Sequence, residues 1–155
     1  MKTESKEYCG KIALVTGAAG FIGSHLVDRL LDLDYRVVVI DDLSSGKLKN
    51  LNPAASFRHS DITQPVASEV FQREQPDLVF HLAAQTSVSY STRDPVKDSE
   101  SNVTGTLRML EAARRYGVEK FIYSSTGGAL YGDRGDSCPS DLGGREDPYR
   151  HDWSG

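Results

Sequence analysis

The chain has 155 residues, a formal net charge of −4 and 26% charged residues, an ordinary composition for one soluble globular domain. The small negative charge gives no reason to expect nucleic acid as a partner. No apolar run approaches the roughly 18 residues of a membrane-spanning helix. The first ten residues contain no apolar segment typical of a secretory signal, and Cys9 and Cys138 match no metal-binding spacing. We therefore expect a cytoplasmic protein without a membrane partner or a metal site.

The first part of the chain predicts a strand, a helix and two further strands. Lys11–Gly17 is a short β-branched run typical of a buried strand. Apolar residues then recur at helical spacing in residues 21–33, namely Ile22, Leu26, Val27, Leu30 and Leu33. Tyr35–Asp41 is nearly continuous in valine and isoleucine, as expected for a parallel strand that is covered on both faces. A weaker third strand is predicted at Ala55–His59.

The second part continues this alternation. Pro65 fits the first turn of a short helix, whose apolar residues are Val66, Val70 and Phe71. Asp77–Ala83 predicts the fourth strand, and Lys120–Ser125 predicts the fifth. Between them a long helix is predicted at Pro95–Tyr116, with Gly117 as its C-terminal stop. This helix is expected to pack through Val103, Leu107 and Leu110.

Strands that alternate with helices predict an α/β fold of the doubly wound, Rossmann type. We expect a parallel sheet of about five strands in the order 3-2-1-4-5, with helices on both faces and a ligand crevice at the carboxyl ends of the strands. Residues 11–131 would form this domain after an N-terminal extension at residues 1–10. Residues 132–155 are rich in Gly, Asp, Ser and Arg, and we expect them to form a loop-like or disordered tail.

A glycine triplet lies between the first strand and the first helix. Gly17, Gly20 and Gly23 have G-x-x-G-x-x-G spacing in "VTGAAGFIGSHL". Such glycines allow a tight turn, close approach of the backbone to a pyrophosphate, and close packing of helix on strand. The helix N-terminus adds unpaired N–H groups and the positive end of the helix dipole. The pattern predicts a dinucleotide site; the alternative is a glycine turn without a ligand.

Asp41 follows at the end of the next strand, near the offset of roughly 20 residues at which a carboxylate binds the adenosine ribose. A carboxylate there would repel the 2′-phosphate of NADP, so the sequence favours NAD. Lys47 keeps the NADP alternative open, because a lysine can bind phosphate as a point charge. The alternative to ribose binding is that Asp41 is a solvated side chain without a ligand.

The chain resembles the extended short-chain dehydrogenase/reductase family, in particular its NAD-dependent nucleotide-sugar epimerases and dehydratases. The motifs that carry this resemblance run in family order from about Lys11 to Asp133. They are "TGAAGFIGSHLV", "DDLSSG", "SDI", "HLAAQTSV", "NVTGTLRMLEAAR" and "KFIYSSTGGALYGD".

The resemblance implies an NAD site that is built from several of these motifs. It assigns Gly17, Gly20, Phe21, Ile22 and Gly23 to the pyrophosphate, Asp41 to the ribose, Asp42, Leu43, Ser44 and Gly46 to the adenosine loop, and Asp61 and Ile62 to the adenine. At the end of the fourth strand it assigns Leu82, Ala83 and Ala84, with Thr86 nearby. Asn102 would reach the cofactor from the long helix, and Ser124 would bind it beside Thr126 after the fifth strand. The alternative for Ile62, Leu82 and Ala83 is core packing.

The resemblance also places a catalytic Ser/Thr segment after the fifth strand. Thr126 matches the hydroxyl that hydrogen-bonds the sugar oxygen, with Ser125 beside it. The alternative is that these hydroxyls cap backbone groups at the strand end. Related dehydratases carry Thr-Asp-Glu here, because elimination of water needs an extra acid and base. In this chain two glycines follow Thr126, which favours epimerase chemistry over dehydration.

Tyr149 lies near the position of the family's tyrosine base. In that pattern a lysine four residues later lowers the pKa of the phenol, but Trp153 occupies that position here. We therefore expect Tyr149 to be a tail residue, and the alternative is that it is a displaced base.

These observations predict the NAD-binding domain of a nucleotide-sugar 4-epimerase that is not catalytically complete as this chain. The alternatives are an active sugar-nucleotide dehydratase or dehydrogenase and a non-enzymatic NAD-binding module. A nucleotide sugar is the expected substrate of the complete enzyme. Self-association is expected through apolar surface of the Pro95–Tyr116 helix.

Overall fold

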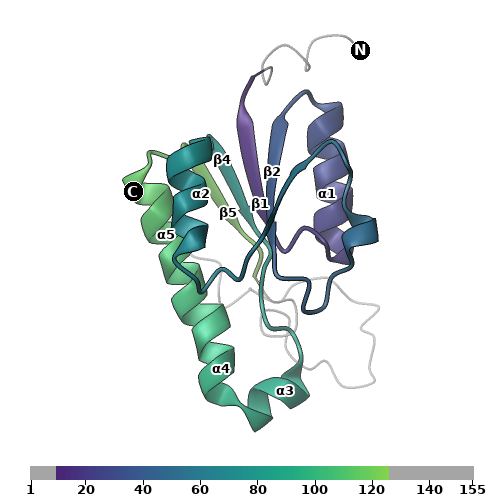
Figure 1. Cartoon of the computed structure of the whole chain (residues 1–155). Coiled ribbons are helices and arrows are strands. Elements are labelled where there is room, and N and C mark those ends of the chain that lie inside the picture. Colours follow the sequence, from purple (N-terminus) through teal and green to yellow (C-terminus); the bar gives the residue numbers. More distant parts are fainter. Residues whose placement is uncertain (1–9, 126–155) are drawn as a thin grey trace, which may run out of the picture. The chain divides into compact units, whose positions relative to one another are not determined.

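A computed structural model describes residues 10–125 of the chain (Figure 1). These residues form a parallel sheet in the order β3-β2-β1-β4-β5, which confirms the predicted fold class and strand order. The strands are β1 (Ile12–Thr16), β2 (Arg36–Asp41), β3 (Ser56–His59), β4 (Leu78–His81) and β5 (Lys120–Tyr123). Residues 1–9, Thr126, Tyr149 and the predicted tail at residues 132–155 lie outside the described residues.

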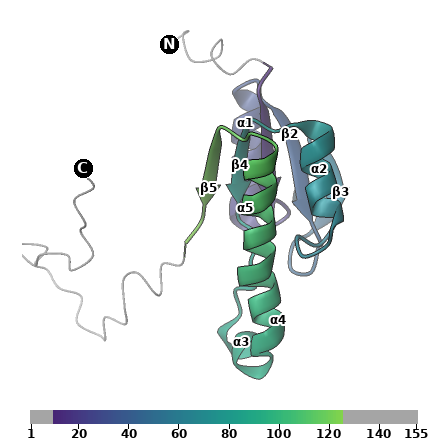
Figure 2. The same cartoon turned by 90° about the vertical axis from the view of Figure 1, so that its left-hand side faces the viewer.

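Helices cover both faces of this sheet (Figures 1 and 2). Helix α1 (Phe21–Asp32) packs on one face, whereas α2 (Val66–Glu74) and α5 (Thr106–Arg115) pack on the other. A short 3-10 turn, η1 (Leu48–Asn50), lies between β2 and β3. Within residues 10–125, no helix has the length and apolar character that crossing a membrane requires.

Alternate residues of the central strands point to opposite layers of helices. Ala13 and Val15 of β1 belong to the cluster of buried residues that contains Val27 and Leu30 of α1. Leu14, between them, belongs to the other cluster, which also includes Phe71, Met109, Ala112 and Ala113 from α2 and α5. Because both faces are covered, β2 is apolar along most of its length, as the sequence predicted.

The predicted long helix at Pro95–Tyr116 is present in the structure as three helical segments that follow one another without a gap. Helix α4 (Pro95–Ser99) is followed by a π-helical turn, η2 (Glu100–Gly105), and then by α5. A further helix, α3 (Val88–Arg93), precedes them and was not predicted. The backbone stays helical at both junctions, where Ser99, Glu100, Gly105 and Thr106 have φ between −64° and −58°. The π turn was not predicted, because apolar spacing does not distinguish it from an α-helical turn. Gly117, at φ +72° directly after the C-cap Tyr116, ends α5 as expected.

The face through which α5 packs is also not the predicted one. Val103, Leu107 and Leu110 are 53%, 60% and 42% exposed. The buried residues of α5 are instead Met109, Ala112 and Ala113, which belong to the core cluster beneath this helix. In α1, Ile22 is likewise exposed although it was predicted on the apolar side. The helices therefore carry apolar residues that the described core does not use.

All strands run in the same direction, so their carboxyl ends share one edge of the sheet. Helices α3 and α4 extend beyond this edge (Figures 1 and 2). The side chains of Ser87 and Asp94 cap these helices by accepting hydrogen bonds from the Tyr90 and Lys97 backbone N–H groups. The loops after β1, β2 and β4 meet at this edge, where the sequence places the ligand crevice.

Candidate cofactor site

The turn after β1 requires glycine at its first position. Gly17 has φ +69°, and a Cβ atom there would lie 2.7 Å from the backbone nitrogen of Ala83 and 2.8 Å from the carbonyl carbon of Leu82. The Gly17 N–H donates to the carbonyl oxygen of Ile40 at 3.0 Å. The glycine-rich loop is therefore in direct backbone contact with the end of β4 and is also bonded to β2.

The same loop leads into α1 without a side chain over the helix end. Gly20 is the N-cap residue and provides no side-chain cap, and the first turn of α1 contains no acidic residue. A Cβ atom at Gly23 would lie 2.5 Å from Ala18 Cα and from the Gly17 carbonyl oxygen, so close packing requires glycine there. Phe21 and Ile22 are exposed at this turn. The positive end of the helix dipole is thus open to an anionic group.

Asp41 is buried at the end of β2 and accepts two backbone hydrogen bonds. Its Oδ2 accepts from the Ala19 N–H at 2.9 Å, and its Oδ1 accepts from the Leu43 N–H at 2.8 Å. A carboxylate has roughly four acceptor positions, so both oxygens retain capacity for the hydroxyls of a ribose. Asp41 therefore ties the glycine-rich loop to β2, a role that the sequence did not predict.

The loop after β2 holds the glycine-rich loop from its other side. The Ala19 carbonyl oxygen accepts from the Lys47 backbone N–H at 3.2 Å and from Asn50 Nδ2 at 2.8 Å. A Cβ atom at Gly46 would lie 2.6 Å from Ala19 Cβ. Leu43 has φ +58°, an uncommon conformation for a bulky residue. Within the loop, Asp42 Oδ1 accepts from the backbone and the hydroxyl of Ser44.

The segment after β3 is hydrogen-bonded to Asp41 at the same edge of the sheet. The Ser60 N–H donates to the Asp41 carbonyl oxygen at 3.2 Å, and Asp61 Oδ1 accepts from the Thr63 N–H at 2.8 Å. Ile62 is buried in the core cluster and lies against Gly105. The structure thus gives Ile62 the packing role that the sequence left open, while Asp61 stabilises a local turn.

The end of β4 carries a buried polar cluster. The Thr16 hydroxyl lies 2.8 Å from His81 Nδ1, and its oxygen accepts from the Leu82 and Ala83 N–H groups at 3.2 and 3.1 Å. His81 is 1% exposed, and burial lowers its pKa to about 4. The imidazole is therefore neutral near pH 7. Leu82 and Ala83 are half-buried, and both pack against core clusters.

The side chain of Asn102 binds the backbone of the segment after β4. Its Oδ1 accepts from the Gln85 N–H at 2.8 Å, and its Nδ2 donates to the Gln85 carbonyl oxygen at 2.9 Å and to Asp98 Oδ1 at 3.1 Å. Ala84 and Thr86, on either side of the half-buried Gln85, are both exposed. Asn102 thus fixes the peptide between two of the predicted site residues.

Ser124 follows β5 at the same edge, and Ser125 is the next residue in the chain. The Ser124 N–H donates to the His81 carbonyl oxygen at 3.2 Å, so this segment lies beside the end of β4. Both serines are exposed. Within residues 10–125 neither hydroxyl has a hydrogen-bond partner.

The structure brings the predicted glycines, the Asp41 loop, the end of β4 and Asn102 to one edge of the sheet. It also shows residues that the sequence did not single out, namely Thr16, Ala19, Asn50, His81 and Thr106. A signal was present for Thr16 and His81, since each is a polar residue within an apolar strand and such residues need buried partners. The roles of all these residues toward NAD stay predictions.

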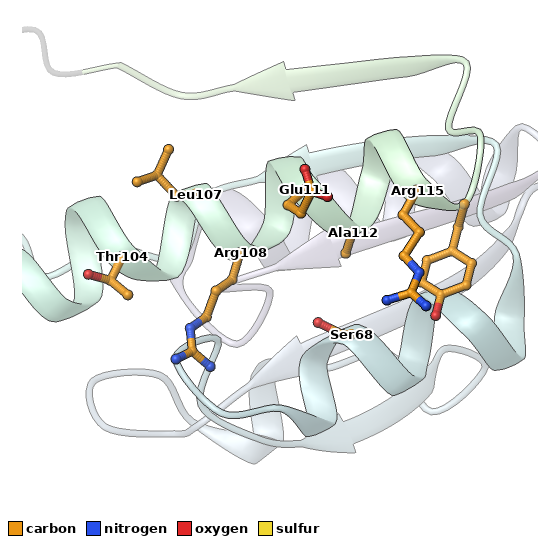
Figure 3. A pocket seen from close by; sticks show the side chains of 8 residues that line it. Ser68, Thr104, Leu107, Arg108, Glu111, Ala112 and Arg115 are labelled. Atoms are coloured by element: carbon orange, nitrogen blue, oxygen red, sulfur yellow. The ribbon is translucent and has the colours of Figure 1, made fainter.

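A separate open groove of about 290 Å³ lies between α2 and α5 (Figure 3). It is lined by Ser68, Thr104, Leu107, Arg108, Glu111, Ala112, Arg115 and Tyr116. The Arg115 guanidinium lies 5.6 Å from the centre of the Tyr116 ring. The groove is on the outer surface of the two helices and shares no residue with the predicted cofactor site, so it is not the dinucleotide crevice.

Known proteins with similar sequences include sugar-nucleotide enzymes of more than one reaction type. The chain is 49% identical over 124 residues to the UDP-glucose 4-epimerase of Mycolicibacterium smegmatis, with 77% of this chain and 40% of that protein covered. It is 40% identical over 125 residues to UDP-glucuronic acid decarboxylase 1 of Arabidopsis thaliana, with 77% of this chain and 27% of that protein covered. The chain thus spans two fifths or less of the length of these relatives.

Solved structures also match. The UDP-glucose 4-epimerase of Thermotoga maritima with UDP-glucose is 50% identical, with a TM-score of 0.76, and 81% of this chain and 41% of that chain are covered. The UDP-glucose 4-epimerase of Thermus thermophilus in complex with NAD is 43% identical, with a TM-score of 0.76, and 84% of this chain and 42% of that chain are covered.

A family model described as the NAD dependent epimerase/dehydratase family matches residues 13–152, which is most of the chain. This match confirms the resemblance that the motifs indicated, and it confirms NAD as the cofactor of the family. The fold, the glycine-rich edge and the sequence agree, and the chain belongs to the NAD-dependent epimerase/dehydratase family.

Proposed function

We propose that this chain binds NAD at the carboxyl edge of β1, β2 and β4 and acts as the cofactor-binding part of a nucleotide-sugar 4-epimerase. The observation that carries the proposal is the double attachment of the glycine-rich loop. Gly17 lies against the backbone of Leu82 and Ala83, while Ala19 is hydrogen-bonded to Asp41. This leaves the uncapped start of α1 open beside a buried carboxylate, as a dinucleotide requires.

The residues present fit NAD. The absence of side chains at Gly17, Gly20 and Gly23 leaves the loop backbone accessible to a pyrophosphate, and the first turn of α1 has no acidic residue that would repel it. Asp41 is held in place by two N–H groups and can accept the ribose hydroxyls. Asp42, Leu43, Ser44, Gly46 and Asp61 would surround the adenosine half, while Ala84, Thr86 and Asn102 would line the nicotinamide half.

When bound, NAD would supply the reversible hydride transfer that a 4-epimerisation requires. The residues of this chain would hold and orient the sugar hydroxyl that loses its proton. Thr126 and Ser125 are the hydroxyls proposed to bind that oxygen. The two glycines after Thr126 provide no extra carboxylate for dehydration.

We also propose that the chain binds NAD without turning over substrate by itself. Tyr149 is the candidate base, but Trp153 stands where a lysine would lower the pKa of its phenol. An ordinary tyrosine, with a pKa of about 10, is protonated near neutral pH and is a poor base. Tyr149 is therefore proposed to be non-catalytic in this chain.

The test begins with calorimetric titration of NAD and, separately, NADP. NAD is expected to bind more tightly than NADP because Asp41 repels a 2′-phosphate. Asp41→Asn is expected to weaken NAD binding by roughly 10- to 150-fold, since charge-assisted hydrogen bonds contribute about 1.5–3 kcal/mol. Glu111→Gln, in the α2–α5 groove, is the control and should bind NAD as the wild type does. No NAD binding by the wild type would refute the proposal.

Turnover is tested next with UDP-glucose, UDP-galactose and UDP-glucuronic acid. The last substrate is included because the similarity to UDP-glucuronic acid decarboxylase 1 favours a second candidate reaction. We expect NAD binding without product formation. Turnover that Tyr149→Phe abolishes would show that the base is present, and carbon dioxide release from UDP-glucuronic acid would establish decarboxylation instead.

A further inference from the structure

A chain of hydrogen bonds links β1, β4 and α5 beneath the proposed NAD site. The Thr16 hydroxyl lies 2.8 Å from His81 Nδ1, and His81 Nε2 lies 3.0 Å from the Thr106 hydroxyl. Thr16 and His81 are direct neighbours in the register of the sheet. Thr106 in turn donates to the carbonyl oxygen of Asn102 at 2.9 Å. The imidazole thus connects the residue before Gly17 to the π-helical turn η2.

One set of donors and acceptors satisfies every group in this series of hydrogen bonds. Thr106 has one hydroxyl hydrogen, and it goes to a carbonyl oxygen that can only accept. With its hydrogen on that bond, Thr106 accepts from His81, which assigns a hydrogen to Nε2. In a neutral imidazole Nδ1 is then the acceptor, so the Thr16 hydroxyl donates to it. This leaves the lone pairs of Thr16 for the Leu82 and Ala83 N–H groups.

The two ends of this series of hydrogen bonds both lead to residues 82–85. At one end Thr16 binds the N–H groups of Leu82 and Ala83. At the other end Thr106 binds the carbonyl of Asn102, whose side chain holds both backbone groups of Gln85. Residues 82–85 therefore lie between two anchors that His81 connects. Leu82 and Ala83 also form the surface that contacts Gly17.

The surroundings of His81 favour only the uncharged ring. The side chain is 1% exposed, and its ring lies 5.9 Å from that of Tyr123 and 5.7 Å from that of Phe121, measured between centroids. Tyr123 is the titratable group that faces it from β5. Within residues 10–125, His81 forms no ion pair that would compensate a buried positive charge. Protonation of Nδ1 would also remove the acceptor that Thr16 uses.

We propose that His81, as a neutral imidazole protonated at Nε2, is a positioning residue that fixes residues 82–85 against the glycine-rich loop and thereby sets the affinity for NAD. The proposal rests on the proposed NAD site. It differs from simple core packing, because the hydrogen bonds of the ring, and not only its volume, would determine how tightly NAD binds.

The tautomer is tested directly on the chain without ligand. Long-range ¹H–¹⁵N correlation spectra of histidine-labelled protein distinguish protonated from unprotonated ring nitrogens, and comparison with His81→Gln assigns the His81 signals. We expect Nδ1 unprotonated and Nε2 protonated at pH 7.5. A ring protonated at Nδ1, or at both nitrogens, would overturn the proposal irrespective of whether NAD binds.

The link to NAD is tested with two substitutions of Thr106. Thr106→Val keeps the shape but removes the acceptor for Nε2, whereas Thr106→Ser keeps the hydroxyl. Titration with NAD is expected to give a dissociation constant about tenfold higher for Thr106→Val, the loss of roughly one buried hydrogen bond, and one within about threefold of wild type for Thr106→Ser. Thr104→Val, on the exposed side of η2, should bind NAD like the wild type.

Hydrogen exchange and thermal unfolding separate positioning from general loss of structure. In Thr106→Val the backbone amides of Ala83 and Gln85 should exchange faster, while those of β2 remain protected. Unchanged NAD affinity in a folded Thr106→Val variant would overturn the proposal. If Thr106→Val does not fold, the proposal is judged from the Thr106→Ser titration and from the tautomer of His81. Weak NAD binding by Thr106→Ser would then overturn the proposal. Failure of the wild type to bind NAD would instead overturn the proposed function, and the tautomer would still be measured.

Discussion

Gly17 occupies a position where two separate physical demands exclude a side chain. Its φ of +69° is strained for other residues, and a Cβ atom would overlap the backbone of Leu82 and Ala83. Gly117 has a similar φ of +72°, but a Cβ atom there would meet no atom within 4 Å. Comparing the two glycines therefore separates the free-energy cost of a positive φ from the cost of the steric overlap with Leu82 and Ala83.

We predict that Gly117→Ala lowers the free energy of unfolding by about 1–2 kcal/mol, the cost of the left-handed conformation. Gly17→Ala should lower it by about 3 kcal/mol, because overpacking adds to that cost. Denaturant unfolding of the two variants beside wild type measures both values. Equal losses in the two variants would show that the loop moves away from β4 at no cost.

His81 predicts a dependence of stability on pH. Burial lowers its pKa from the ordinary 6.5 to about 4, so the unfolded chain takes up a proton between these pH values and the folded chain does not. The contribution of His81 to the free energy of unfolding is therefore constant above about pH 6.5, and it decreases as the pH falls from 6.5 to about 4. The decrease from this group is about 3 kcal/mol.

His81→Gln removes the titrating group and serves as the comparison for that prediction. The difference in unfolding free energy between wild type and His81→Gln should be largest near pH 7.5 and should shrink toward pH 4. Chemical denaturation at several pH values measures it. A difference that stays constant over this range would mean that the folded protein protonates His81 as readily as the unfolded chain does.

At the scale of elements, Glu74 attaches the end of α2 to two strands. Its carboxylate is buried and pairs with Arg36 of β2 at 2.8 Å and with Arg58 of β3 at 2.9 Å. Burial by itself raises the pKa of Glu74. The hydrogen bonds from Arg58 and Arg36 lower it by more than this, so the pKa of Glu74 lies below its usual range. This carboxylate stabilises the fold above its unfolded pKa, and that contribution is lost as the pH falls through its folded pKa.

We predict that Glu74→Gln lowers the free energy of unfolding by about 1–3 kcal/mol at pH 7, because it leaves two guanidinium groups without their buried carboxylate. Arg73→Gln is the control, since Arg73 is mostly exposed and lies 3.9 Å from the same carboxylate. It should change stability by less than about 0.5 kcal/mol. An equal effect of both substitutions would contradict this assignment.

For the whole molecule, part of the described surface is apolar and has no partner within residues 10–125. Val96, Val103, Leu107 and Leu110 recur at helical spacing along α4, η2 and α5, and all are exposed. On the α1 face of the sheet, Phe80 and Ile122 are only half-buried, because no described helix covers that part of β4 and β5. Exposed apolar surface of this kind favours association.

We predict that the 155-residue chain self-associates and that the double substitution Val103→Glu, Leu107→Lys suppresses association. Both positions are exposed, so the charged side chains remove apolar surface without entering the core. Light scattering after size exclusion measures the mass at increasing concentration. Arg29→Glu, Asp32→Lys on α1 is the matched control and should associate like the wild type. A monomeric wild type at high concentration would refute this prediction.

Much of the fold was predictable because it depends on patterns that are local in the chain. The continuous apolar run at β2, the helical spacing in α1 and the glycines between β1 and α1 predicted the sheet order and its ligand edge. Gly117 likewise marked the end of α5. These signals hold because burial on both faces and backbone conformation restrict the residue type at each position.

By itself the sequence determined the fold class, the family and the edge of the sheet where the proposed site lies. Only the tertiary structure decided which helix face packs, where the π turn occurs, and how Thr16, His81 and Thr106 connect. It also decided that Asp41 binds Ala19 and that Gly46 lies against the same residue. The physical reason is that each of these contacts joins residues far apart in the chain, so no local spacing encodes them and only the packed structure brings them together.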